Sequence, residues 1–281
     1  GSSAPSTNYA SQFFANTTSS IMQLRNTANN AHINLFSLAG APAFPLDGTI
    51  NSINIGKGAN SVAGNTVLGE NALDASVTGG NNTAIGKDAL TSNTSGQDNT
   101  AVGIQALDTN TTGGFNTAVG SISLDANTTG SRNSAFGRNS LAANTEGSDN
   151  TGVGTSALAA NTTASNNTAV GKSALAANTT GAQNTAVGSN ALDANTTASD
   201  NTAVGSNSLG ATTTGSGNTA LGMQALQVNT TADNNTACGN DALRRNTTGT
   251  QNVAVGSFAL DHNTTASNNT AVGDQSLTTN T

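Results

Sequence analysis

The sequence contains little charge, few aromatic residues and almost no cysteine. Of 281 residues, 8% are charged and 3% are aromatic, tryptophan is absent, and Cys238 is the one cysteine. A single thiol excludes an internal disulfide framework. Eight basic residues against fifteen acidic residues give a net charge of −7, which argues against an electrostatic footprint for nucleic acid. We therefore expect no nucleic-acid partner.

The residues that carry most catalytic and metal chemistry are also scarce. His32 and His262 are the only histidines, and no acidic pair is clustered as glycoside hydrolysis requires. We expect no enzyme activity, no catalytic or metal site and no cofactor. No apolar run approaches the length of a membrane span and no signal peptide is visible, so we expect no membrane insertion.

Proline is absent after Pro45, and a 17-residue repeat fills that part of the chain. A typical unit, residues 184–200, reads NTAVGSNALDANTTASD. Constant length without insertions is typical of stacked coils that must stay in register. The missing proline fits continuous strand pairing. The units open at Asn65, Asn82, Asn99, Asn116, Asn133, Asn150, Asn167, Asn184, Asn201, Asn218, Asn235, Asn252 and Asn269.

Two columns of the repeat are regularly large and apolar. The ninth position is Leu in every unit, and the fourth is mostly Val, as in Val187. We expect both columns to point into the coil, and Cys238, in the fourth column, to be a small buried hydrophobe. Gly follows the fourth position in every unit, which predicts a corner with positive φ.

The third position is Ala in nearly every unit. Alternate side chains of a strand share a face, so a Val that points inward implies an Ala that points outward. So uniform a small residue suggests close packing against a neighbouring subunit, although a tight bend is an alternative. Two large side chains per coil make a thin core, which also favours association. The predicted subunit-packing column is Ala84, Ala101, Ala118, Ala135, Ala169, Ala186, Ala203, Ala220, Ala237, Ala254 and Ala271.

Polar columns complete the unit. Asn at the first and twelfth positions can form ladders of amide hydrogen bonds between coils. Asn-Thr-Thr also matches a glycosylation sequon, but a glycan on every coil would crowd the stack, so we favour the structural role. The tenth position carries a broken acidic stripe, which could bind Ca²⁺ but is better explained as a solvated rim. This stripe consists of Asp74, Asp108, Asp125, Asp193 and Asp261.

Residues 1–50 do not repeat and form a separate N-terminal cap or attachment segment. Apolar residues at steps of three and four predict a short helix there, either as a cap on the solenoid or as a coiled coil. The predicted seam is Phe14, Thr17, Ile21, Leu24, Ala28, Ala31, Leu35 and Leu38. Residues 51–281 form the repeat region, with an irregular first coil at 51–64 in which Ile53 and Ile55 indicate a strand, and regular units from residue 65.

Units such as NTAVGKSALAANTTG (residues 167–181) resemble repeats that precede the endosialidase-type chaperone domain in phage tail fibres and related bacterial surface proteins. Residues 51–64 resemble the head repeats of trimeric autotransporter adhesins. The resemblance covers residues 51–281 and implies a trimeric β-roll.

Together these observations predict an all-β protein, a β-solenoid of 17-residue coils that forms a parallel homotrimer. The expected function is a fibre or adhesin shaft, located extracellularly on a cell surface or virion. Its expected partners are further copies of itself and a cell-surface receptor or glycan. The alternative is an ice-binding solenoid that uses a Thr/Ala ladder. That alternative depends on which face of Thr-Ala-Val looks outward, and an inward Val places Thr inside as well.

Overall fold

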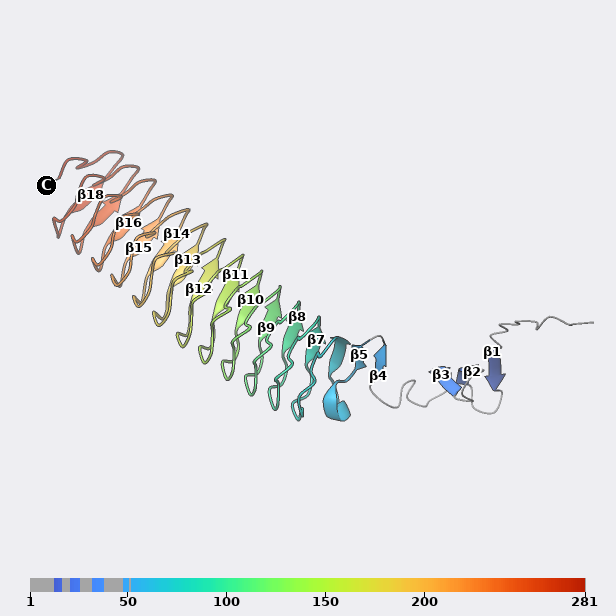
Figure 1. Cartoon of the computed structure of the whole chain (residues 1–281). Helices are drawn as coiled ribbons and strands as arrows, with labels where there is room; N and C mark the ends of the chain where they lie inside the picture. Colours follow the sequence, from blue (N-terminus) through green and yellow to red (C-terminus); the bar gives the residue numbers. More distant parts are fainter. Residues whose placement is uncertain (1–12, 17–20, 26–31, 38–47, 51, 281) are drawn as a thin grey trace, which may run out of the picture. The chain divides into compact units, whose positions relative to one another are not determined.

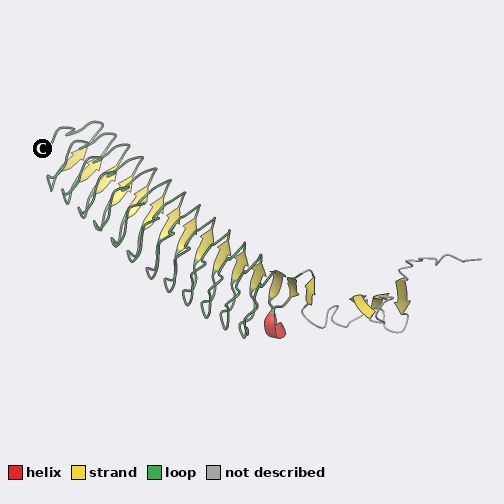
Figure 2. Ribbon diagram, in the orientation of Figure 1, coloured by secondary structure: helices red, strands yellow, loops and turns green. Residues whose placement is uncertain are grey.

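The computed structural model describes residues 13–16, 21–25, 32–37, 48–50 and 52–280. The chain divides into two compact units, Gly1–Asp47 and Gly48–Thr281. Within the described residues the protein is all-β apart from one short 3₁₀ turn, η1 (Ala59–Ser61). Figure 2 shows strands alternating with loops along the second unit. The predicted all-β solenoid is therefore confirmed.

The first unit contains a three-stranded antiparallel sheet in the order β1-β2-β3. Its strands are β1 (Phe13–Asn16), β2 (Ile21–Arg25) and β3 (His32–Ser37). The predicted helix is wrong here, because four seam residues lie in strands: Phe14, Ile21, Leu24 and Leu35. The other four, Thr17, Ala28, Ala31 and Leu38, lie outside the described residues. Ile33 and Leu35 are two apart, which is the apolar spacing of a strand and not of a heptad seam.

The second unit opens with antiparallel strands. β4 (Gly48–Ile50) pairs with β5 (Ile53–Gly56), and β5 pairs with β6 (Thr66–Gly69). The strand predicted at Ile53 and Ile55 is confirmed by β5.

From β6 onward every strand pairs in parallel with the strand 17 residues further along. The sheet has 15 strands in simple sequence order, and Figure 1 shows them side by side, one per coil. The strands after β6 are β7 (Thr83–Ile85), β8 (Thr100–Val102), β9 (Thr117–Val119), β10 (Ser134–Phe136), β11 (Thr151–Val153), β12 (Thr168–Val170), β13 (Thr185–Val187), β14 (Thr202–Val204), β15 (Thr219–Leu221), β16 (Thr236–Cys238), β17 (Val253–Val255) and β18 (Thr270–Val272).

Each coil closes through turns that stay in register with both neighbours. The backbone N–H of Asn190 donates to the carbonyl of Lys172 in the preceding coil, at 3.0 Å. The N–H of Leu192 donates to the carbonyl of Ser208 in the following coil, also at 3.0 Å. Gly188 turns the corner after the strand with φ 139°, and an added Cβ there would lie 2.5 Å from the carbonyl oxygen of Gly205. The predicted glycine corner is confirmed.

The ninth-column leucines fill the coil, as predicted. Twelve are fully buried, from Leu73 to Leu260, and Leu277 in the last coil is 54% exposed. The buried leucines adopt positive φ, for example 51° at Leu192. Such a backbone costs an L-residue energy, so the packing of the coil must hold it in place. Ala residues at the eighth position, such as Ala191, are buried beside them.

The strand faces are the reverse of the prediction. The third-column Ala side chains point into the coil and are buried, whereas the fourth-column side chains point outward. The residues predicted to pack against a neighbouring subunit are instead 0 to 3% exposed within a single chain. They are Ala84, Ala101, Ala118, Ala135, Ala169, Ala186, Ala203, Ala220, Ala237, Ala254 and Ala271. These methyl groups cannot form a surface between subunits because their own coils enclose them.

The narrow interior explains the Ala column. At Gly152, which occupies the same column, an added Cβ would lie 2.6 Å from Ser140 Oγ and 3.4 Å from Leu141 Cγ. The contact with Ser140 is particular to this coil, because most coils have Ala at that position, but a Cβ is already at van der Waals distance from Leu141. The opposite wall therefore lies close to the Ala column. Close packing does restrict this column, as the sequence suggested, but the packing partner is the coil itself.

Two buried ladders of Asn run along the stack, and this prediction is confirmed. In the first column, Asn184 Nδ2 donates to the carbonyl of Ala198 at 2.9 Å, and Asn184 Oδ1 accepts the backbone N–H of Asn201 at 3.1 Å. In the twelfth column, Asn195 Nδ2 donates to Asn178 Oδ1 at 2.7 Å. Both columns are buried, so the Asn-Thr-Thr amides are engaged inside the coil.

Candidate functional site

The most distinctive surface of the second unit is the outer strand face, which we define as the side chains of the first and third residues of β6–β18. Thr at the first position is mostly half-buried, and the third position is larger and more exposed. Exposed apolar residues on this face are Leu68, Phe136, Val153, Val170, Val187, Val204, Leu221, Val255 and Val272, most of them between 36 and 47% exposed. Cys238 also lies here and is half-buried, so the prediction of a buried Cys238 is wrong.

The outer strand face carries no charged side chain in β6–β18. The thirteen strands, about 4.8 Å apart and three residues wide, give a flat area of roughly 600 Å². Monomeric soluble proteins rarely expose a contiguous apolar patch larger than about 300–600 Å². The face has a comparable extent, with apolar side chains in one of its two columns and mostly Thr in the other.

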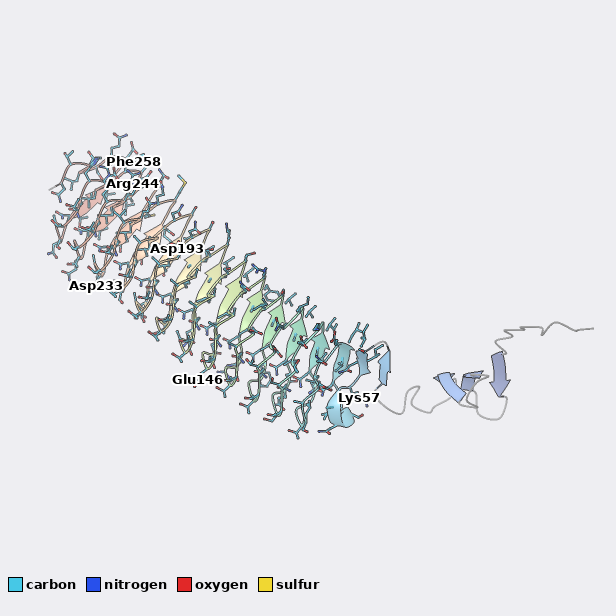
Figure 3. The ribbon with its side chains drawn as sticks, in the orientation of Figure 1. Lys57, Glu146, Asp193, Asp233, Arg244 and Phe258 are labelled. Carbon is cyan, nitrogen blue, oxygen red and sulfur yellow. The ribbon has the colours of Figure 1, made fainter. Side chains whose placement is uncertain are left out.

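Charges lie on the turns instead. Figure 3 shows Glu146 and Asp233 at one edge of the solenoid and Arg244 and Phe258 at the opposite edge. Ion pairs along the turns join neighbouring coils, such as Lys87 with Glu70 at 3.2 Å. This distribution leaves the outer strand face as an uncharged strip between polar turns.

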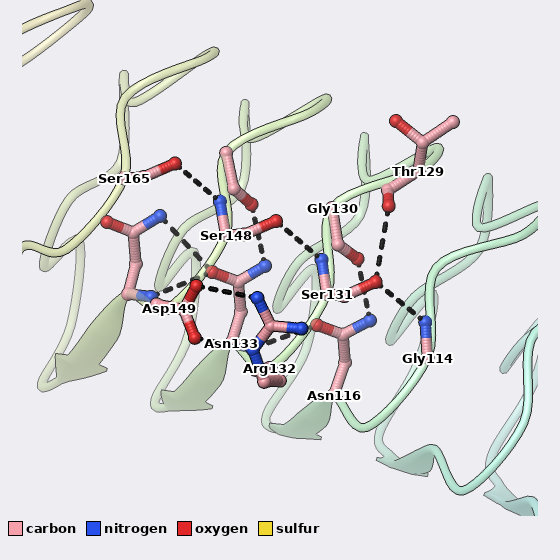
Figure 4. Close-up of polar contacts among 12 residues, drawn as sticks. Gly114, Asn116, Thr129, Gly130, Ser131, Arg132, Asn133, Ser148, Asp149 and Ser165 are labelled. Carbon is pink, nitrogen blue, oxygen red and sulfur yellow. Dashed lines mark hydrogen bonds and ion pairs between the residues drawn. The ribbon is translucent and has the colours of Figure 1, made fainter.

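The clearest turn pair is Arg132 with Asp149, seen in Figure 4. Arg132 Nε and Nη2 donate to the two carboxylate oxygens at 2.6 and 2.9 Å. This hydrogen bonding holds the pKa of Asp149 below its ordinary value. Beside the pair, the N–H of Ser131 donates to Ser148 Oγ at 3.0 Å. Both contacts join residues 17 apart, so the turns reinforce the register of the coils.

The acidic stripe of the tenth column is dispersed in the structure. Burial raises the pKa of Asp108, Asp125 and Asp193, and the charge of Asp108 further raises that of Asp125. Asp261, in the same column, approaches Arg244 of the preceding coil at 3.4 Å. Among the described residues, no three His, Cys, Asp or Glu side chains gather where they could hold a metal ion.

A small ionic cluster lies at the other end of that stripe. Arg244 lies between Asp241 in its own coil, at 3.5 Å, and Asp261 in the next coil, at 3.4 Å. Both Asp side chains are only 7% exposed, and His262 Nδ1 is 3.5 Å from Asp261 Oδ2. Arg244 compensates these two buried acids, which gives the cluster a structural role in joining the two coils.

Comparison with known proteins gives no relative. We found no match to this chain among protein-family models, curated proteins or solved structures. In the part of the chain that the structure describes, no helix has the length and hydrophobicity to cross a membrane. The outer strand face is the candidate functional site. The sequence did not predict it, because the large apolar residues of the fourth column were expected to point into the coil.

Proposed function

We propose that this chain is the shaft of a fibre or adhesin, whose copies associate along the outer strand face. In this proposal the shaft is extracellular, on a cell surface or virion, and holds an attachment function at a distance. The observation that carries the proposal is the uncharged column formed by the third residues of β6–β18, in which nine apolar side chains are exposed and the other four are half-buried. The resemblance to phage tail fibres and trimeric autotransporter adhesins supports the same role.

The size of the face suits association with further copies. A stable protein interface buries about 800 Å² on each partner. The roughly 600 Å² of sheet, together with the flanking turn residues, approaches that area. Interface cores are depleted of charge, as this face is. A homotrimer would enclose one such face per subunit around a common axis.

Sedimentation of the purified chain tests the proposal. We expect a trimer at micromolar concentration. Leu221→Glu with Val255→Glu puts two charges on the outer strand face and should give a folded monomer, with unchanged circular dichroism. The matched control, Thr231→Glu with Thr265→Glu, puts the same charges on exposed turns of the same coils, in the column where Glu146 stands naturally. The control should remain trimeric.

A wild-type chain that sediments as a monomer at all concentrations would contradict the shaft proposal. Association that both double variants weaken equally would also contradict it, because the outer strand face would then have no special part.

A second candidate function is ice binding, and the corrected orientation of the strands favours it. Thr185, Thr202 and their equivalents share the outward face with Val, so a regular row of hydroxyl and methyl groups about 4.8 Å apart faces outward. Thermal hysteresis that falls when both threonines are replaced by Tyr would support it, and a chain that leaves ice growth unchanged would contradict it. Strong activity in a monomer would contradict the shaft.

A further inference from the structure

One strand of the outer strand face differs from all the others. β10 reads Ser134-Ala135-Phe136, the only strand of β6–β18 with Ser at its first position and an aromatic residue at its third. Phe136 is 42% exposed, and Ser134 is half-buried on the same face. The largest side chain of one column and the smallest side chain of the other therefore lie in the same coil.

This coincidence has a physical consequence for copies that pack face to face. A phenyl ring extends well beyond a Val side chain, so it would hold two flat faces apart unless the surface opposite were recessed. Ser134 lacks the γ-methyl group that Thr presents in neighbouring strands, such as Thr117 and Thr151. Among the first residues of β6–β18, the recess occurs only in the coil that carries the ring.

We propose that the copies pack in parallel and in register, with Phe136 of one copy against Ser134 of the next. This inference rests on the proposed association through the outer strand face. In a cyclic assembly the column of third strand residues, which includes Phe136, faces the column of first strand residues of the next copy, which includes Ser134. Equal coils therefore meet. A slip of one coil places the ring against Thr117 or Thr151. Antiparallel overlap of all thirteen coils places it against Thr202.

The thermodynamic test is a cycle of substitutions at this layer. Ser134→Thr restores the methyl group and should weaken association about tenfold by overlap with the ring. In a Phe136→Val background, where no ring needs the recess, Ser134→Thr should change association less than about threefold. Sedimentation measures all four proteins.

A monomeric control separates contact between copies from contact within one chain. In the Leu221→Glu, Val255→Glu background, Ser134→Thr should leave the melting temperature unchanged. A clear drop there would show that Ser134 accommodates Phe136 of its own chain, and it would overturn the proposal.

The single cysteine reports direction. Cys238 lies on the same face, in the eleventh coil, so parallel in-register copies bring their Cys238 residues into one layer. Antiparallel copies overlapping fully separate them by eight coils, or roughly 38 Å. Spin labels on Cys238 of the assembled full-length chain should therefore give one short distance.

A long distance, or association insensitive to Ser134→Thr, would overturn the register proposal and leave the shaft proposal standing. A wild-type chain that does not associate would refute the shaft proposal itself, and the register proposal with it.

Discussion

The assignment of the two strand faces can be tested with two adjacent residues of β13. Ala186 is fully buried, and Val187 is 36% exposed on the outer strand face. Replacing each by Leu adds apolar volume on opposite sides of the same strand. Ala186→Leu must fit three more carbon atoms inside a coil, whereas Val187→Leu adds one carbon atom at a surface.

The structure sets the expected magnitudes. Ala174 and Leu175, which occupy the positions that Ser140 and Leu141 hold beside Gly152, are fully buried as Ala186 is, so a larger side chain at Ala186 must displace packed atoms. Overpacking a close-packed core costs about 1–3 kcal/mol, and occasionally more. A surface substitution of the Val187→Leu kind stays within about 0.5 kcal/mol.

Urea unfolding followed by circular dichroism measures both effects. The comparison belongs in the Leu221→Glu, Val255→Glu background, because association would otherwise add to the apparent stability. We expect Ala186→Leu to lower the free energy of unfolding clearly and Val187→Leu to leave it almost unchanged. The opposite ranking would refute the orientation of the strands and the candidate site built on it.

Three further predictions concern the interior and the acidic stripe. Thr212 interrupts the twelfth-column ladder and leaves Asn195 Oδ1 buried without a partner, so Thr212→Asn should stabilise the fold by about 1 kcal/mol in urea unfolding; a destabilised variant would contradict this. Leu192→Ala should cost about 2–5 kcal/mol in the same assay, because the side chain is fully buried, and a cost below that of a surface substitution would be inconsistent with the core. The raised pKa of Asp125 means that the folded state binds the proton more tightly, so stability falls as pH rises from the ordinary value of 3.8 through the raised pKa. Asp125→Asn should therefore melt higher than wild type at pH 7 and equal to it below that ordinary value, whereas a constant difference across pH would show that the charge is not the cause.

The period and the columns of the repeat were enough to predict the stack, its Leu core and its glycine corners. The 17-residue period requires one coil per unit, the unbroken Leu column identifies residues such as Leu192 as core, and Gly188 marks the turn with positive φ. The Asn columns predicted ladders because a side-chain amide can both donate and accept along a stack. These features are local or periodic, so one chain read column by column is sufficient to find them.

The direction in which the strand side chains point could be read only from the folded coil. Alternation places Thr185 and Val187 on one side and Ala186 on the other, but it does not say which side is inside. That depends on the space left after Leu192 and Ala191 fill the opposite wall, and this wall lies close to the Ala column. Hydrophobicity alone pointed to Val as the inward residue. The volume of the coil excluded it, and so placed the large apolar column on the outer strand face.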